Sequence, residues 1–293
     1  MVTSYEHPPP FERIKAMNVN DIIETAADEE LSFKLENDLK KAARALTKPE
    51  VKVLISLYYS VQKTRIVTGN QIAALTKSGE PHEVIGWVFE RFFRLEKAIK
   101  GALEEFSKHD PGCQWARSIT GIGPVLACGL SAHIDIGEAP TVGHIWSFCG
   151  YNPEVEWKKG EKRPWNATLK TICWKIGESF VKVKGLESDV YGKVYEARKV
   201  QEIQRNEEGK FAGQAEAKLE KHKIGKSTEA YKAYSKGKLP PAHIHARSTR
   251  YAVKLFLAHW HHTEYVRTYK KDPPLPYAIA IGGHAHHILP PEI

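Results

Sequence analysis

The chain has 293 residues, of which 42% are hydrophobic and 27% charged, proportions that are ordinary for a globular protein. No apolar stretch approaches the roughly 20 residues that cross a bilayer, and residues 1–15 are charged and proline-rich instead of carrying the apolar core of a signal peptide. We therefore expect no membrane partner and a cytoplasmic location.

The N-terminal third shows the spacing of amphipathic helices. Apolar residues predict a helix over 31–46. Thr47 and Glu50 form a capping-box pair, which predicts the start of a second helix over about 50–67. We expect the Thr-Gly-Asn sequence at 68–70 to interrupt that helix.

The clearest helix lies over 82–107, where apolar residues recur every three or four positions along one stripe. Asp110-Pro111-Gly112 predicts its end. Such a stripe is typical of a bundle helix or a short coiled coil, so a homodimer through helix 82–107 is one partner that we consider.

The remainder of the chain lacks the alternating pattern of β-strands. Two short helices are predicted over 112–119 and 125–133. Exposed polar helices follow over 187–238, with a flexible stretch near 207–213. The pair Pro240-Pro241 then predicts the start of a long helix that runs to about Tyr269.

The charge is unevenly distributed along the chain. The formal net charge is +8, yet residues 1–150 carry 17 Lys and Arg against 19 Asp and Glu, whereas residues 151–293 carry 26 against 16. All of the excess positive charge therefore lies in the second half. Such asymmetry indicates a polyanionic partner, usually a nucleic acid, although a solubilising surface is the simpler interpretation.

The sequence Thr120-Gly121-Ile122-Gly123-Pro124 separates the two short helices. Glycine readily adopts positive φ, so this sequence allows a tight turn with Ile122 inserted between the helices. The N–H groups of the turn and of the next helix start would then bind a phosphate oxygen. This is a helix-hairpin-helix arrangement, which contacts the DNA backbone without reading bases. A plain turn between two helices is the alternative.

Three motifs follow one another in this region. They are residues 119–127 (Ile-Thr-Gly-Ile-Gly-Pro-Val-Leu-Ala), residues 139–153, which end in Cys-Gly-Tyr-Asn-Pro, and residues 165–170 (Trp-Asn-Ala-Thr-Leu-Lys). In this order and spacing they resemble the C-terminal domain of the insertion sequence 110/116/902 transposase family. The resemblance covers about residues 80–182 and also matches helix 82–107 to the coiled coil of that family. It implies a mobile genetic element and a role in DNA transposition or recombination.

The resemblance further implies an N-terminal ribonuclease-H-like domain with metal-binding acidic residues, and a nucleophilic serine in a loop after the second motif. Here only about 80 residues precede the coiled coil, and their spacing is helical. The matching loop over 154–164 contains no serine, and the nearby hydroxyls belong to Ser147 and Tyr151. We therefore expect no catalytic site of its own, and we assign no catalytic residue, metal or cofactor.

A basic loop lies between Trp157 and Trp165. Its cations would neutralise phosphates, and an indole stacks well on an unpaired base. The alternative is a solvated turn with both tryptophans in the core. The predicted DNA-binding residues are Thr120, Gly121, Ile122, Gly123, Pro124, Lys158, Lys159, Lys162, Arg163 and Lys170.

Arg247, Arg250 and Lys254 share one face of the predicted last helix, either as a second backbone-contacting surface or as a solvated face. Nine of the 14 histidines lie at or after His222, but they lack the spacing of a metal site. The four cysteines form no Cys-x-x-Cys pair, so we expect buried apolar thiols in a reducing compartment.

Together these features predict a mainly α-helical DNA-binding protein linked to transposition, with linear or branched DNA as its partner. An active recombinase with an unrecognised nucleophile or a partner-supplied acidic domain remains an alternative. An RNA-binding module is a second alternative, because the resemblance implies a family that uses a guide RNA. A helical scaffold is a third. The expected segments are a disordered arm (1–16), a helical or coiled-coil region (17–110), the helix-hairpin-helix domain (111–183) and a basic helical extension with a tail rich in proline, glycine and histidine (184–293).

Overall fold

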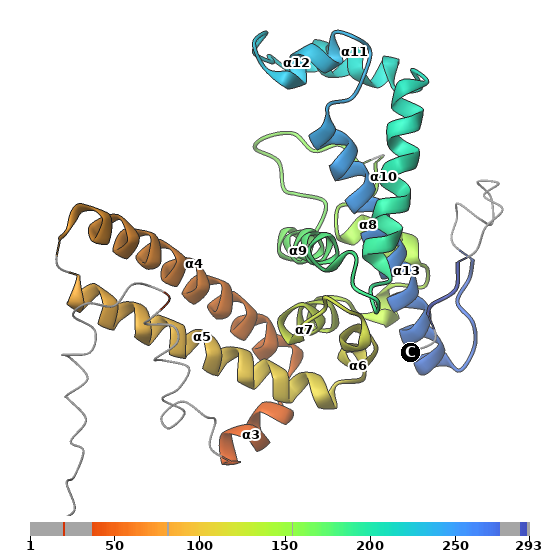
Figure 1. The fold of residues 1–293 in the computed structure, drawn as a ribbon. Helices are drawn as coiled ribbons and strands as arrows, with labels where there is room; N and C mark the ends of the chain where they lie inside the picture. The colour runs from red at the N-terminus through yellow and green to blue at the C-terminus, as the bar shows by residue number, and fades with distance from the viewer. Residues whose placement is uncertain (1–19, 21–36, 81, 154, 276–287, 292–293) are drawn as a thin grey trace, which may run out of the picture. The chain divides into compact units, whose positions relative to one another are not determined.

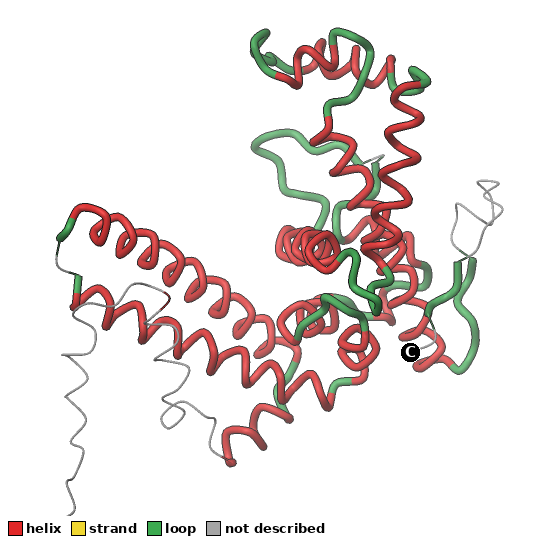
Figure 2. Tube along the Cα trace, viewed as in Figure 1, coloured by secondary structure: helices red, strands yellow, loops and turns green. Residues whose placement is uncertain are grey.

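The computed structural model describes residues 20, 37–80, 82–153, 155–275 and 288–291. These residues form helices joined by loops, with no strand among them (Figures 1 and 2). The predicted mainly α fold is therefore confirmed. The chain divides into two compact units, residues 1–113 and 114–293. The arm predicted over 1–16 lies outside the described residues.

The first unit is built on two long helices that lie side by side, α4 (Lys48–Ser78) and α5 (Glu83–His109), with the short α3 (Asn37–Arg44) packed against α5 (Figure 1). α4 begins with the predicted capping box. The backbone N–H of Thr47 donates to Oε2 of Glu50 at 2.8 Å, and the Thr47 hydroxyl oxygen accepts the N–H of Glu50.

The interruption predicted at 68–70 is wrong. α4 continues through Gly69, which is buried together with Thr68. The Thr68 hydroxyl donates to the carbonyl of Thr64 at 2.9 Å, so its polar group is satisfied within the helix. A glycine in a helix interior costs about 1 kcal/mol relative to alanine, which the packing of α4 on α5 offsets.

The helix predicted over 82–107 is confirmed as α5. Phe89, Ile99, Leu103 and Phe106 of its stripe are buried. α5 packs on both α3 and α4, so the stripe has partners inside its own chain. A homodimer through this helix stays a prediction.

α13 (Pro241–Tyr269) is the central helix of the second unit. It lies beside α10 (Tyr191–Glu207) and also packs against α9 (Ala167–Val183) and α8 (Val142–Phe148) (Figure 1). The predicted start of α13 at the Pro-Pro pair and its end at Tyr269 are confirmed. The unit also contains α7 (Pro124–His133) and the 3-10 turn η1 (Ile136–Glu138), and α6 (Pro111–Ser118) spans the division between the units.

The crossing of α9 and α13 is unusually close at Gly177. A Cβ at Gly177 would lie 2.4 Å from Cγ2 of Thr249, so any larger residue would push the two helices apart. The nearby core is aromatic, because the rings of Phe180 and Tyr191 stack with centroids 4.9 Å apart and both meet the ring of Phe256 edge-on. These contacts fix α9, α10 and α13 against one another.

α11 (Ala212–Lys221) and α12 (Glu229–Tyr234) form a small cap beyond the end of α10 (Figure 1). The segments that lead into and out of this cap are joined by two hydrogen bonds between Asn206 and Leu239, which we name the clamp. The Asn206 amide donates to the Leu239 carbonyl at 3.0 Å and accepts the Leu239 N–H at 2.8 Å. The stretch predicted to be flexible contains a hydrogen-bonded turn. Phe211, Ala215 and Tyr234 of the cap form a small core together with Leu239 and with Ile244 of α13.

Candidate nucleic-acid interface

The predicted hairpin turn joins α6 to α7. Gly121 has φ +95°, a conformation that favours glycine, and Ile122 is 5% exposed. The Ile122 N–H donates to the carbonyl of Ile119 at 3.0 Å, which closes the turn. The backbone therefore has the tight turn and the buried isoleucine that the sequence indicated.

The inner side of this turn is held by the rest of the second unit. The Ser179 hydroxyl donates to the Gly121 carbonyl at 2.5 Å, and the Thr120 hydroxyl donates to Oγ of Ser188 at 2.9 Å. A Cβ at Gly121 would meet Ser179 and Val183 at 3.1 Å. Thr120 and Gly121 therefore serve mainly to anchor the turn.

The outer corner of the turn is Gly123, the exposed N-cap residue of α7. A Cβ there would meet nothing within 4 Å. Pro124 occupies the first helical position, where its missing N–H costs nothing, and the following N–H groups have no acceptor within the helix. This corner is the part of the hairpin open to an anion.

The basic loop places Lys158, Lys159, Lys162 and Arg163 at the surface. Its two tryptophans are half-buried and meet edge-on, with the centroids of Trp157 and Trp165 6.3 Å apart. The Trp157 N–H donates to the Glu161 carbonyl at 2.8 Å, and the Arg163 guanidinium lies 5.4 Å from the Trp157 ring centre. The loop is thus an ordered turn whose indoles already have cationic neighbours.

Three further cations gather beside this loop, and we name them the cation cluster: Lys170 of α9, and Arg250 and Lys254 of α13. Nζ of Lys170 lies 4.0 Å from the ring centre of Trp165. Nζ of Lys254 lies 4.1 Å from that of Trp146, whose N–H donates to the Lys254 carbonyl at 3.1 Å. Each lysine is therefore held above an indole.

The positive charges of the cation cluster lie close enough to repel one another. Burial lowers the pKa of both Lys170 and Lys254, and repulsion from the charge of Arg250 lowers each pKa further. Arg163 adds to this effect at Lys170. Among the described residues no carboxylate forms an ion pair with Lys170, Arg250 or Lys254. A bound anion would relieve this mutual repulsion.

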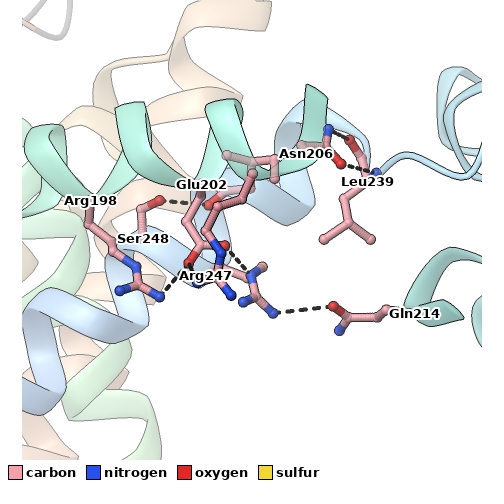
Figure 3. A network of polar contacts seen from close by, with 9 residues as sticks. Arg198, Glu202, Asn206, Gln214, Leu239, Arg247 and Ser248 are labelled. Atoms are coloured by element: carbon pink, nitrogen blue, oxygen red, sulfur yellow. Dashed lines mark hydrogen bonds and ion pairs between the residues drawn. The ribbon is translucent and has the colours of Figure 1, made fainter. Parts of the chain in front are cut away.

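Arg247 does not belong to this surface, although the helical spacing placed it on one face with Arg250 and Lys254. Its Nε donates to Oε2 of Glu202 at 2.6 Å (Figure 3). Its guanidinium also lies 4.5 Å from the ring centre of Phe211. Glu202 is fully buried and also pairs with Arg198. The guanidinium of Arg247 is therefore held in an ion-pair network inside the fold.

The pKa of Glu202 reflects two opposing effects. Burial alone would raise it, but the hydrogen bond and charge of Arg247, together with those of Arg198, outweigh burial and hold the pKa below its usual value. Glu202 is therefore an anion in the folded chain.

The hairpin and the cation cluster lie at different ends of α9. Ser179, which holds the turn, and Lys170 are separated by nine helical positions, roughly 14 Å along the axis and half a turn around it. The structure thus brings Lys170 and Arg163 together with Arg250 and Lys254, and it leaves the hairpin as a separate surface.

Trp174 is a residue that sequence reasoning missed. Its side chain is 57% exposed and lies one turn along α9 from Lys170. The only signal in the sequence is the four-residue spacing of a lysine and a tryptophan.

The two hydroxyls considered as nucleophiles, those of Ser147 and Tyr151, lie in surroundings that do not activate them. Burial raises the pKa of Tyr151 far above its ordinary value, which disfavours the reactive tyrosinate. The hydroxyl oxygen of Ser147 accepts a hydrogen bond from the Asn152 amide at 3.2 Å. Neither side chain is placed beside a general base among the contacts described.

Histidines and cysteines serve the core. Nδ1 of His259 lies 2.7 Å from the Tyr191 hydroxyl, and Nε2 of His261 lies 2.8 Å from the Ala139 carbonyl oxygen. All four cysteines are buried thiols, as predicted. Within the described ranges no His, Cys, Asp and Glu cluster could hold a metal. The histidines at 284, 286 and 287 lie outside those ranges.

The described helices include none with the length and apolar character needed to cross a membrane. Comparison of the chain with models of known families, with curated proteins and with solved structures finds no match, so the transposase resemblance stands on its three motifs alone.

Proposed function

We propose that the chain is a DNA-binding protein whose second unit contacts the sugar-phosphate backbone at the cation cluster and at the exposed corner of the hairpin. The three transposase-like motifs link this binding to DNA transposition or recombination. Phosphate contacts carry no base information, so binding follows the shape of the backbone. In this proposal the chain has no strand-cleaving chemistry of its own.

The observation that carries the proposal is the lack of a carboxylate partner for Lys170, Arg250 and Lys254 among the described residues. Several other cations of the second unit have such a partner, as Arg247 has in Glu202 and Lys184 in Glu196. Two partly buried lysines close to an exposed arginine, without an acid, favour a bound anion. A phosphodiester backbone supplies such anions at regular intervals.

The hairpin supplies a second, weaker argument. Gly123 is exposed, has open space around it and stands at the N-terminus of α7, where the helix dipole favours negative charge. The oxygens of a backbone phosphate at this corner would accept hydrogen bonds from the N–H groups of the first turn.

The central experiment measures fluorescence anisotropy of labelled linear duplex, four-way-junction DNA and single-stranded RNA with the full chain over a series of salt concentrations. We expect Lys170→Gln/Arg250→Gln/Lys254→Gln to weaken DNA binding and to reduce the slope of log affinity against log salt by about 2 to 3, since three phosphate contacts are lost.

The matched control removes the same charge from ion-paired lysines, with Lys184→Gln/Lys210→Gln/Lys232→Gln. This control should keep most of the slope. Equal losses in the two triple variants would show that only net charge matters, and an unchanged slope in the first would overturn the proposal. Tighter binding of the single-stranded RNA than of a DNA strand of the same sequence would favour the RNA-binding alternative.

The hairpin is tested by Gly123→Asp against Gly123→Asn. Both residues are good N-caps, so both should preserve α7, but only aspartate places a negative charge where the phosphate would lie. We expect weaker DNA binding for Gly123→Asp alone, at equal melting temperature. Equal binding by the two variants would reduce the hairpin to a structural turn.

The absence of cleavage chemistry is tested with 5′-labelled DNA. A protein-linked DNA product that disappears in Ser147→Ala or in Tyr151→Phe would contradict the proposal and favour an active recombinase.

A further inference from the structure

Trp174 differs from the other tryptophans near the cation cluster. Trp146 and Trp165 are half-buried, and each has a lysine ammonium about 4 Å above its ring. Trp157 has Arg163 above it. Trp174 is 57% exposed, and no cation or aromatic ring is found against it among the described contacts. Its indole is therefore the one in this region with a face available to a ligand.

The position of Trp174 is fixed by its neighbours on α9. Lys170, Trp174 and Glu178 follow one another at one-turn intervals, so they lie on one side of the helix. Lys170 lies close to Arg250, and Oε1 of Glu178 lies 3.8 Å from Nε2 of His245. Trp174 therefore lies between the cation cluster and an acidic residue that marks the far limit of the positive surface.

This arrangement suits one nucleotide. Lys170 and Trp174 are about 6 Å apart along the helix axis, a separation that the phosphate and base of one nucleotide span. An exposed indole beside cations is the pattern of surfaces that bind unpaired nucleotides, because every base has a face that stacks on an aromatic ring. In duplex DNA the neighbouring base pairs cover these faces.

We propose that Trp174 stacks on an unpaired DNA base whose adjacent phosphate is bound by the cation cluster. The chain thereby prefers single-stranded or junction DNA with an open base over fully paired duplex. This inference rests on the proposed function, since the cation cluster supplies the neighbouring phosphate contact.

The experiment compares the wild type, Trp174→Ala and Trp174→Phe on a labelled poly-thymidine strand and on a blunt duplex. We expect Trp174→Ala to lose about 5- to 100-fold in affinity for the single strand and less than about twofold for the duplex. Trp174→Phe should keep most of the single-strand affinity, because phenylalanine also stacks. Leu186→Ala is the matched control, since Leu186 is 52% exposed in the same unit.

Tryptophan emission gives a second readout. Stacking of a base on Trp174 should quench part of the emission when the single strand binds, and this quenching should be missing in Trp174→Phe although binding persists. Equal quenching in the wild type and Trp174→Phe would overturn the assignment to Trp174.

The two proposals fail in different ways. If the triple variant of the cation cluster weakens binding of both probes while Trp174→Ala weakens neither, or weakens both equally, the stacking inference is wrong and the proposed function stands. If the triple variant binds both probes like the wild type, the proposed function fails, and with it the inference.

Discussion

Arg247 and Arg250 lie three residues apart on α13, yet their surroundings are opposite. Arg247 donates to the fully buried Glu202, whereas Arg250 lies among Lys170 and Lys254 with no described carboxylate paired to it. The first arginine holds α13 to α10 and the second is available to an external anion. The comparison teaches that the pairing of each cation, more than the count of cations, decides which part of a basic helix is open to an external anion.

The largest expected effect comes from breaking the buried pair. Glu202→Gln leaves the guanidinium groups of Arg198 and Arg247 facing a neutral amide, and loss of one partner of a buried ion pair costs about 3 to 5 kcal/mol. Urea denaturation should show this loss in the free energy of unfolding. Glu229→Gln, which breaks the exposed pair with Lys232, should cost at most about 1 kcal/mol. Similar losses in the two variants would contradict the distinction drawn here.

The same pair sets a pH dependence. The pKa of Glu202 is lowered in the folded chain, so its contribution to stability is complete above the ordinary glutamate pKa of about 4.3. This contribution is lost as the pH falls below that value and through the folded pKa. Wild type and Glu202→Gln should therefore converge in unfolding free energy in acid, and a constant gap down to low pH would rule out this linkage.

The next effect tests the crossing that brings Lys170 near Arg250. Gly177→Ala places a methyl group 2.4 Å from Cγ2 of Thr249, and such overpacking costs about 1 to 3 kcal/mol. Thermal unfolding should show the loss. Adding Thr249→Ser removes the opposing methyl group and should restore most of it. An unchanged melting temperature in Gly177→Ala alone would mean that the crossing yields easily.

A pair of single substitutions sharpens the comparison along α13. Arg250→Gln should leave stability nearly unchanged and lower the salt slope of DNA binding by about 0.9, the value of one phosphate contact. Arg247→Gln removes the same charge, but it should lower stability and leave the slope nearly unchanged, because Glu202 holds this guanidinium in an ion pair inside the fold. Anisotropy measures the salt slope of both variants, and urea denaturation measures their free energy of unfolding. Indistinguishable variants would refute this expectation.

The smallest expected effect is on the pH dependence of binding. The lowered pKa values of Lys170 and Lys254 mean that these lysines lose charge at lower pH than an ordinary lysine, and a bound phosphate opposes that loss. DNA affinity should therefore decline as the pH rises toward the alkaline range. Lys170→Arg/Lys254→Arg should flatten this decline, because arginine stays charged. A decline of the same size in the double variant would assign it to other groups.

Local patterns were sufficient for most helices of the fold. The stripe of α5, the capping box at Thr47 and the Pro-Pro start of α13 act within a few residues, so they can be recognised in one sequence. Gly69 was misjudged because the packing of α4 on α5, and not its own propensity, decides that the helix continues.

The candidate site was predictable only in part for a related reason. Lys170 and Arg163 belong to one stretch of sequence, and their proximity followed from it. Arg250 and Lys254 join them through the crossing of α9 and α13. Arg247 does not join this cluster because it pairs with Glu202, which lies 45 positions away in the sequence. Contacts of this range are invisible to periodicity, because they depend on how whole helices pack.

The clamp between Asn206 and Leu239 joins the two ends of the cap, so the cap is a separate element of the second unit. The cap between them departs from and returns to one place, and Ile244 of α13 completes its small core. Changing the length of the loop between α11 and α12 should leave the register of α10 against α13 intact, provided that the clamp and the contacts of Phe211 and Gln214 with Arg247 are kept. A tag or reporter domain inserted in that loop would therefore leave the crossing of α10 and α13 unchanged.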